Sequence, residues 1–337
     1  ISRMVMLLRL TKTELMMGFW QKTMIAVACS KPLRRAGEAV GRKTGLAAQF
    51  VSGTDGAGHV KRTQELAKQG IRVSSFYLGE YVTDLAQVAE TVDAITAVIP
   101  KLDRVGLDVH VSIDPSQLGY MQDPGMLDDN AHKIAGLIRD VGGEKAGRRC
   151  CRMMIDMEDF DMVDDTLALH DRLLEAGYPV AQTLQARLLR TEADMVRKIA
   201  QGAMIRLVKG AMAPPDHVAF TRRRDIDENY LKLASMMLSD EARLTGFMPV
   251  FGSHHRELVE YIAKVADERG WEREAFEFEM LYGVNQPLQR DLVSLGYRLR
   301  LYAPFGGDWW AYAWRRVGEN PRNLGLLLRS RLNATGL

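Results

Sequence analysis

Two adjacent arginines near the carboxyl end of the chain, Arg315 and Arg316, are the side chains with the clearest capacity to bind a charged ligand. On a helix they share one face with Tyr312 and Glu319, because positions i, i+3, i+4 and i+7 lie above one another. Two guanidinium groups beside an aromatic ring form a fork that suits a carboxylate or a phosphate. The alternative is a solvated surface helix held by salt bridges, which is the usual context of an arginine pair.

The residues before this pair favour the ligand-binding interpretation. Alternating side chains over Tyr297–Leu301 predict a strand, and Pro304 and the glycines after it are predicted to end that strand. Asp308 can then cap a helix that begins at Trp309. Because α/β proteins place ligands where strands end, a helix in this position can bring its arginines to a ligand.

Apolar, β-branched segments alternate with amphipathic segments along most of the chain. The first kind predicts strands at Ile71–Tyr77, Leu107–Ile113, Arg152–Asp156, Pro179–Leu184, Met204–Val208, Pro249–Phe251, Phe276–Met280 and Tyr297–Leu301. The second kind predicts helices at Leu85–Val98, Asn130–Ile138, Val163–Glu175, Glu192–Ile199, Asp227–Leu238, Arg256–Arg269 and Pro287–Leu295. Eight strands in such alternation over roughly 250 residues predict a (β/α)₈ barrel. A doubly wound open sheet is the alternative, but Leu78, Gly79 and Glu80 after the first strand do not form its glycine-rich fingerprint.

Polar side chains are predicted at the carboxyl end of every strand, where a barrel builds its site. They are Glu80, Asp114, Asp156, Glu158, Asp159, Gln182, Gln185, Arg206, Lys209, Ser253, His254, His255, Glu277, Glu279, Arg300 and Tyr302. Structural ion pairs that seal the barrel could explain any one of them. The mixture of cations, hydroxyls and backbone donors suits a ligand with phosphates and an anionic ring, while Lys209 leaves a Schiff-base reaction open.

Composition excludes several other classes of function. The chain has 337 residues, a net charge of +2 and 47% hydrophobic residues, which is typical of globular proteins and argues against nucleic acid as the main partner. No metal-ligand spacing is present, and the three cysteines are expected to be reduced thiols. No apolar run is long enough to span a membrane, although peripheral contact with a membrane surface remains open.

Six segments together resemble the flavin-dependent proline dehydrogenase family, in its monofunctional bacterial form. They are YLGEY at 77–81, MIDMED at 154–159, RLVKGA at 206–211, FGSHH at 251–255, FEFEMLYG at 276–283 and YAPFGGDWWAYAWRRVGEN at 302–320. The resemblance covers about residues 70 to 325, in the family's order. It implies a distorted (β/α)₈ barrel over residues 66–337, an N-terminal helical segment over 1–65 and a final helix over the barrel mouth.

The resemblance also implies an activity. Members of the family bind FAD at the carboxyl ends of the strands and oxidise L-proline to 1-pyrroline-5-carboxylate, the first step of proline catabolism. Electrons then pass from the reduced flavin to a quinone. The implied location is the cytoplasm, with peripheral contact at the inner membrane, and the implied partners include neither nucleic acid nor metal.

The family's roles can be carried over residue by residue. Arg315 and Arg316 are expected to hold the substrate carboxylate, with Tyr302, Tyr312, Leu207, Asp114 and Met212 around the substrate. Asp156, Arg206 and Tyr302 are expected at the reacting end, with Arg206 beside flavin N5. Gln185, Lys209, Gly210, Ala211, Ser253 and His254 are expected along the FAD, and Glu279 near its adenosine end.

Two positions depart from the family's pattern. Asp114 stands where the family commonly has a lysine, and Met212 stands where it usually has a tyrosine. Asp114 would place a second acid beside Asp156, so one of the two is expected to have a raised pKa unless a cation lies between them. Both changes lie on the substrate side, so a related cyclic imino acid such as hydroxyproline, pipecolate or a modified proline is an alternative substrate. A flavin-binding but catalytically silent module and a flavin-free lyase that uses Lys209 are further alternatives.

Overall fold

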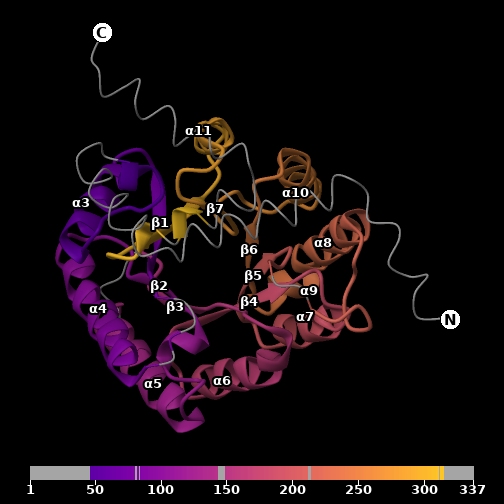
Figure 1. Cartoon of the computed structure of the whole chain (residues 1–337). Coiled ribbons are helices and arrows are strands. Elements are labelled where there is room, and N and C mark those ends of the chain that lie inside the picture. The colour runs from indigo at the N-terminus through magenta and orange to yellow at the C-terminus, as the bar shows by residue number, and fades with distance from the viewer. Residues whose placement is uncertain are drawn as a thin grey trace, which may run out of the picture.

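The fold follows the alternation of strands and helices that the sequence predicts. The computed structural model describes residues 46–79, 82, 84–142, 149–211, 214–310 and 312–314. Within this part of the chain, eight parallel strands close into a barrel in the order β1 to β8, and β8 pairs with β1. Helices surround the barrel (Figure 1). The predicted (β/α)₈ barrel is therefore confirmed, and the alternative of a doubly wound open sheet is excluded. Residues 1–45 of the predicted N-terminal segment lie outside the described residues.

The strands lie close to their predicted positions. They are β1 Ile71–Tyr77, β2 His110–Ile113, β3 Arg152–Ile155, β4 Val180–Gln185, β5 Met204–Val208, β6 Met248–Gly252, β7 Glu277–Leu281 and β8 Leu299–Phe305. The prediction for β8 is wrong at both ends, because the strand begins two residues later and continues through Pro304. Beyond Tyr302, β8 no longer pairs with β7, so the missing N–H of Pro304 breaks no ladder with that strand. On this side Gly53 instead forms an isolated bridge with Phe305, and the backbone N–H of Ser52 donates to the carbonyl of Pro304 at 2.8 Å.

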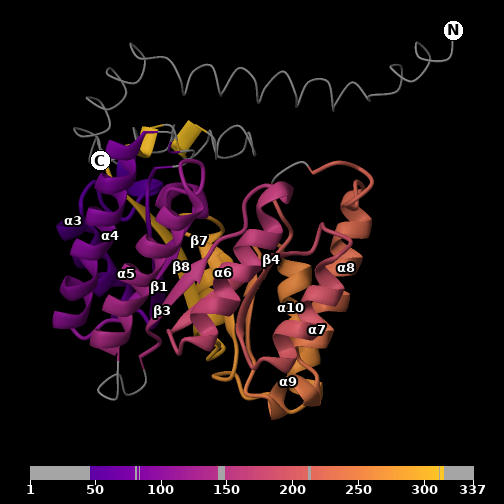
Figure 2. The same cartoon turned by 90° about the horizontal axis from the view of Figure 1, so that it is seen from below.

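Helices connect the strands on the outside. They are α3 Gly56–Ala67, α4 Leu85–Arg104, α5 Pro124–Gly142, α6 Val163–Glu175, α7 Thr191–Ala200, α8 Arg223–Met237, α9 Asp240–Leu244, α10 Arg256–Glu268 and α11 Gln286–Ser294, with short 3₁₀ helices η1 Leu46–Gln49, η2 Pro115–Leu118 and η4 Phe160–Met162. Figure 2 shows α4 to α8 standing side by side along the strands. The short helix α9 was not predicted from the sequence. Ser239 caps it by accepting a hydrogen bond from the backbone N–H of Ala242 at 3.1 Å.

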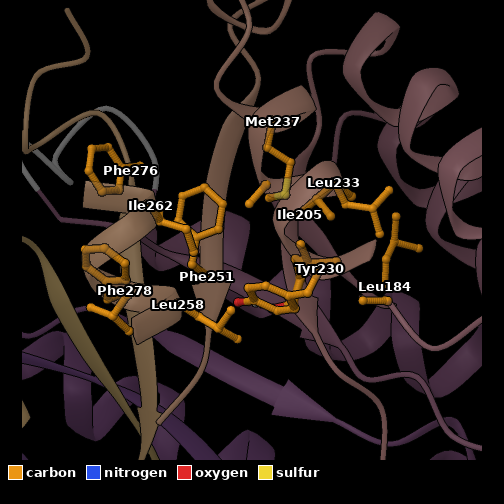
Figure 3. Close-up of a cluster of buried hydrophobic side chains, with 14 of the residues drawn as sticks. Leu184, Ile205, Tyr230, Leu233, Met237, Phe251, Leu258, Ile262, Phe276 and Phe278 are labelled. Carbon is orange, nitrogen blue, oxygen red and sulfur yellow. Dashed lines mark hydrogen bonds between the residues drawn. The ribbon is translucent and has the colours of Figure 1, made fainter. Parts of the chain in front are cut away.

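The main core lies between the barrel and the helices. Tyr230, Leu233 and Met237 project from one face of α8 toward Ile205 of β5 and Phe251 of β6 (Figure 3). Each such side chain contributes about 1.5–3 kcal/mol by leaving water. Because side chains alternate along a strand, this outward packing directs the intervening residues of β5 into the barrel.

Two residues predicted at the barrel mouth lie at its opposite end. Arg300 is the second residue of β8 and Glu277 is the first of β7, so both belong to the amino end of the barrel. The buried guanidinium of Arg300 contacts both carboxylate oxygens of Glu277, at 2.8 and 3.1 Å, and Asp108 at 2.9 Å. Arg300 was wrongly predicted at the mouth because the predicted strand ended at Leu301, whereas β8 continues to Phe305.

A buried histidine fastens α3 to the barrel. The Nδ1 atom of His59 lies 2.6 Å from the hydroxyl of Ser52, and its Nε2 atom lies 2.7 Å from the hydroxyl of Ser75 in β1. The imidazole also stacks on Phe305, with 4.5 Å between ring centroids. Burial lowers the pKa of His59 to about 3, so the ring is neutral in the folded protein.

This histidine is expected to make the fold sensitive to acid. Between pH 6.5 and pH 3 the unfolded chain binds a proton at His59 and the folded chain does not, so stability is lost as the pH falls. At about 1.4 kcal/mol per pH unit, His59 alone should remove about 2 kcal/mol between pH 7.5 and pH 5.0. Urea unfolding at the two pH values should therefore show a smaller acid loss in His59→Gln than in the wild type. His132→Gln, at a half-buried helical position, is the control, and equal acid losses in all three proteins would contradict the prediction.

Candidate active site

A cavity of about 360 Å³ opens at the carboxyl end of the barrel. It is lined by Phe76, Asp114, Asp156, Met157, Glu158, Thr183, Gln185, Arg206, Val208, Gly210, Ala211, Gly252, His254, Glu279, Met280, Leu281, Tyr302 and Tyr312. Its volume lies within the range of roughly 300–1,000 Å³ that is usual for ligand pockets. Ten of the predicted site residues share this cavity, so the structure brings them together from distant parts of the sequence.

Arg206 is the central cation of the cavity. It projects inward from β5, and its side chain is 5% exposed. Its guanidinium forms ion pairs with Asp156 and with Glu279, the latter at 2.5 Å. It also donates hydrogen bonds to the hydroxyl of Thr183, at 2.9 and 3.1 Å. These four contacts come from β4, from β7 and from the end of β3, and together they hold the guanidinium in one orientation, as a preorganised electrostatic site requires.

Asp156 connects this cation to the aromatic wall. The hydroxyl of Tyr302 donates a hydrogen bond to Asp156 at 2.9 Å, and that of Thr183 lies 3.2 Å from its other oxygen. The guanidinium carbon of Arg206 also lies 5.3 Å from the centre of the Tyr302 ring. Burial raises the pKa of Tyr302 well above its usual value, so the phenol stays a hydrogen-bond donor at neutral pH.

Asp114 is the acid that resists ionisation. Burial raises its pKa well above the usual range, the carboxylate of Glu158 raises it further, and Arg206 offsets only part of this effect. The expected raised pKa is therefore present, but its charge partner was wrongly predicted. Asp156 is paired with Arg206, and the acid that acts on Asp114 is Glu158, whose two oxygens accept hydrogen bonds from the backbone and hydroxyl of Ser116 at 2.8 and 2.7 Å.

Small residues open the wall between β4, β5 and β6. Gly210 has a φ of +101°, and a Cβ atom there would lie 2.9 Å from the Oε1 atom of Gln185. A Cβ atom on Gly252 would lie 2.8 Å from Val208. Both positions therefore require glycine, and with Ala211 they leave a low, smooth surface in the cavity.

Three predicted residues do not line the cavity. Leu207 is fully buried in the layer between β5 and α8, because it alternates with Arg206 and Val208 along the strand, so its expected contact with the substrate is wrong. Lys209 forms an ion pair with Asp227 of α8, outside the cavity lining, so among the described residues no lysine lines the cavity for the Schiff-base alternative. The hydroxyl of Ser253 instead accepts a hydrogen bond from the backbone N–H of His255 at 3.1 Å. Arg315, Arg316, Met212 and the strand-end residue Glu80 lie outside the described residues.

Several cavity residues were not among the predicted site residues. Phe76, Thr183 and Val208 could have been found from strand alternation, since each lies two residues from another inward-facing position. Glu158 was recognised as a strand-end acid but was not assigned to the site. Leu281 lies two residues from Glu279 and follows the same alternation, whereas Met280 of β7 carried no comparable signal.

The final helix begins at the mouth, as predicted. Residues 309, 310 and 312–314 are helical, and Trp309, Trp310 and Tyr312 are buried against Phe50 and Phe76. Tyr312 lines the cavity, so this face of the helix is directed at the site. Among the described residues, no group of three or more histidine, cysteine, aspartate or glutamate side chains could hold a metal ion.

A closed barrel with a preorganised arginine and several acids in a cavity at its carboxyl end defines a (β/α)₈ enzyme-type site. Comparison with known proteins identifies the family within this class. The family model described as proline dehydrogenase matches residues 59–328. The chain therefore belongs to the proline dehydrogenase family.

Individual relatives agree with this assignment. Proline dehydrogenase 2 of Bacillus subtilis (strain 168) is 31% identical over 278 residues, which cover 82% of this chain and 88% of that protein. The proline dehydrogenase of Deinococcus radiodurans is 32% identical over 292 residues, which cover 85% of this chain and 90% of that protein.

Solved structures show the same fold. The crystal structure of proline utilization A (PutA) from Bdellovibrio bacteriovorus, inactivated by N-propargylglycine, aligns with a TM-score of 0.75 and 20% identity over 90% of this chain. This chain spans 36% of that PutA chain. A mutant of PutA from Bradyrhizobium japonicum aligns with a TM-score of 0.63 and 22% identity over 81% of this chain and 30% of that one.

Proposed function

We propose that this protein oxidises L-proline to 1-pyrroline-5-carboxylate with FAD as the resident cofactor. Family membership supports the reaction, and one observation in the cavity carries the proposal. Arg206 is a buried, fully oriented guanidinium at the centre of a cavity that also offers aromatic side chains for a small ring. Such a cation stabilises negative charge that develops beside it during the reaction.

The cavity residues fit a flavin. The Oε2 atom of Glu279 is buried without a hydrogen-bond partner among the described residues, as expected where a ligand supplies one. Gly210, Ala211 and Gly252 leave a smooth wall for a planar ring, and His254 and Gln185 add polar groups. FAD would supply a hydride acceptor here. Glu279 was expected near the adenosine end, but its ion pair with Arg206 associates it with the reacting end, and we assign it there.

The chain's own residues bind and orient the substrate. Arg315 and Arg316 are the proposed partners of the substrate carboxylate, and their positive charge favours the neutral form of the ring amine, from which hydride can leave. Tyr302 and Tyr312 are proposed to contact the ring, and Asp156 to hold Tyr302 in place. Holding the reacting carbon in one orientation is a large part of the expected rate enhancement.

One experiment separates this proposal from its competitors. The purified protein should be yellow, and its flavin should bleach when L-proline is added without oxygen. Bleaching only with another cyclic imino acid would support the second candidate, for which Asp114 in the cavity wall is the favouring observation. A yellow protein that no cyclic amine bleaches would indicate a silent module, and a colourless protein would exclude the flavin.

The carboxylate role proposed for the arginine pair can be tested by substitution. Arg315→Met is expected to raise the KM for L-proline by about a hundredfold while FAD stays bound, because it removes one charge-assisted contact of roughly 1.5–3 kcal/mol and half of a bidentate fork. Steady-state kinetics and flavin absorbance measure the two quantities. Arg243→Met, on α9 at the amino end of the barrel, is the control. An unchanged KM would remove the carboxylate role from Arg315.

The acceptor and the location belong to the same proposal. We infer that a quinone takes the electrons and that the protein works in the cytoplasm, with peripheral contact at the inner membrane. Among the described helices, none has the length and apolar character needed to cross a bilayer. Turnover with a soluble quinone should greatly exceed turnover with oxygen.

A further inference from the structure

The four carboxyl groups that line the cavity differ in their ion-pair and hydrogen-bond partners. Asp156 and Glu279 are both paired with Arg206. Both oxygens of Glu158 accept hydrogen bonds from Ser116. Asp114 alone, among these four, has neither an ion pair nor a hydrogen bond from a side chain in the described part of the chain, so its carboxyl group is available to a ligand, as is the unpartnered Oε2 atom of Glu279.

Local structure fixes the orientation of Asp114. It stands at the end of β2 and forms a capping box with Gln117 of η2, in which the side chain of Gln117 accepts from the backbone N–H of Asp114 at 3.2 Å. The backbone N–H of Gln117 can occupy at most one oxygen of the Asp114 carboxyl group. The other oxygen therefore remains for a ligand in the cavity that Asp114 lines.

The surroundings of Asp114 decide its charge. The titratable groups around it come from three neighbouring parts of the barrel, namely Asp156 and Glu158 after β3, Arg206 of β5 and Tyr302 of β8. The one cation among them is already shared by two acids. A buried carboxyl group in this position is most stable as the neutral acid, which can both donate and accept a hydrogen bond.

A neutral acid that faces a ligand selects for a polar partner. An unsubstituted pyrrolidine ring would present only CH₂ groups to Asp114 and leave a buried polar group unsatisfied. A ring hydroxyl would accept from and donate to the same carboxyl group. Sites that hydrogen-bond a substrate hydroxyl discriminate strongly against the analogue that lacks it.

We propose that Asp114 is a specificity-determining residue and that the site prefers a cyclic imino acid with a ring hydroxyl, such as hydroxyproline, over the unsubstituted ring. The inference rests on the proposed function, since it names the substrate class for the same cavity. It assigns Asp114 to substrate recognition and not to the cofactor.

The test compares kcat/KM for trans-4-hydroxy-L-proline and for L-proline in three proteins. The ratio of the two values should exceed 1 in the wild type and should stay within about threefold of the wild-type value in Asp114→Asn, whose amide also donates and accepts. It should fall at least about tenfold in Asp114→Leu, which is the effect of one lost hydrogen bond of about 1.4 kcal/mol. Flavin content per chain, measured by absorbance, should be equal in all three.

A pH series gives a second measurement if Asp114→Leu folds poorly. The wild-type ratio should fall as the pH rises and Asp114 loses its proton, whereas the ratio of Asp114→Asn should stay flat. A wild-type ratio below 1, or a ratio that does not depend on residue 114, would overturn the inference while the proposed function stands. If neither imino acid reduces the flavin, the proposed function itself has failed.

Discussion

Arg206→Met is expected to lower the rate of flavin reduction by L-proline by about 10²- to 10³-fold, which is the usual effect of removing one preorganised electrostatic group from an active site. The same change should destabilise the fold, because Asp156 and Glu279 would remain buried without their cation. Breaking a buried ion pair in this way costs roughly 3–5 kcal/mol. Single-turnover reduction without oxygen measures the rate, and thermal unfolding measures the stability.

Two companion variants separate these effects. Arg206→Met combined with Glu279→Gln removes one unpaired charge and should recover part of the lost stability, but it should not recover the rate. Arg206→Lys keeps the charge but loses the planar fork that contacts Thr183, Asp156 and Glu279 together, so an intermediate rate is expected. If the double variant regained the wild-type rate, Arg206 would be only a structural ion-pair partner.

The barrel itself could be predicted because its signal is repeated many times. Each strand is an apolar run and each helix an amphipathic one, so an error at one boundary does not change the topology. The range predicted for β5 agrees with the structure residue for residue, and it placed Arg206 in the cavity. Side-chain alternation then determines where the residues after Arg206 point. Leu207 points away from the cavity, and Val208 lines it.

Contacts between strand ends could not be predicted in the same way. The sequence predicts acids at adjacent strand ends, but it does not determine which acid meets the arginine. Asp156 and Glu279 reach Arg206 from opposite sides, and this leaves Asp114 beside Glu158. These pairings depend on register and rotamers, which are set by long-range packing and not by local pattern.

The arginine at the opposite end of the barrel provides the second large effect. Arg300→Met should lower the free energy of unfolding by about 3–5 kcal/mol, because Glu277 and Asp108 lose a fully buried cation. At roughly 2–4 °C per kcal/mol, the melting temperature should fall by about 10 °C. Urea and thermal unfolding measure the change, and Arg300→Met combined with Glu277→Gln should recover part of it.

The rate of flavin reduction per folded molecule should not change in Arg300→Met, and this makes it a matched control for Arg206→Met. Both arginines are buried, both contact two acids, and both lie inside the barrel. They lie at opposite ends of the barrel. A rate loss in Arg300→Met as large as that in Arg206→Met would mean that any buried charge defect disables the protein, and the rate loss in Arg206→Met would then no longer locate the chemistry. A normal rate in Arg300→Met would show that losing a buried cation at the amino end of the barrel reduces stability alone. The rate loss in Arg206→Met would then locate the reaction in the cavity at the carboxyl end.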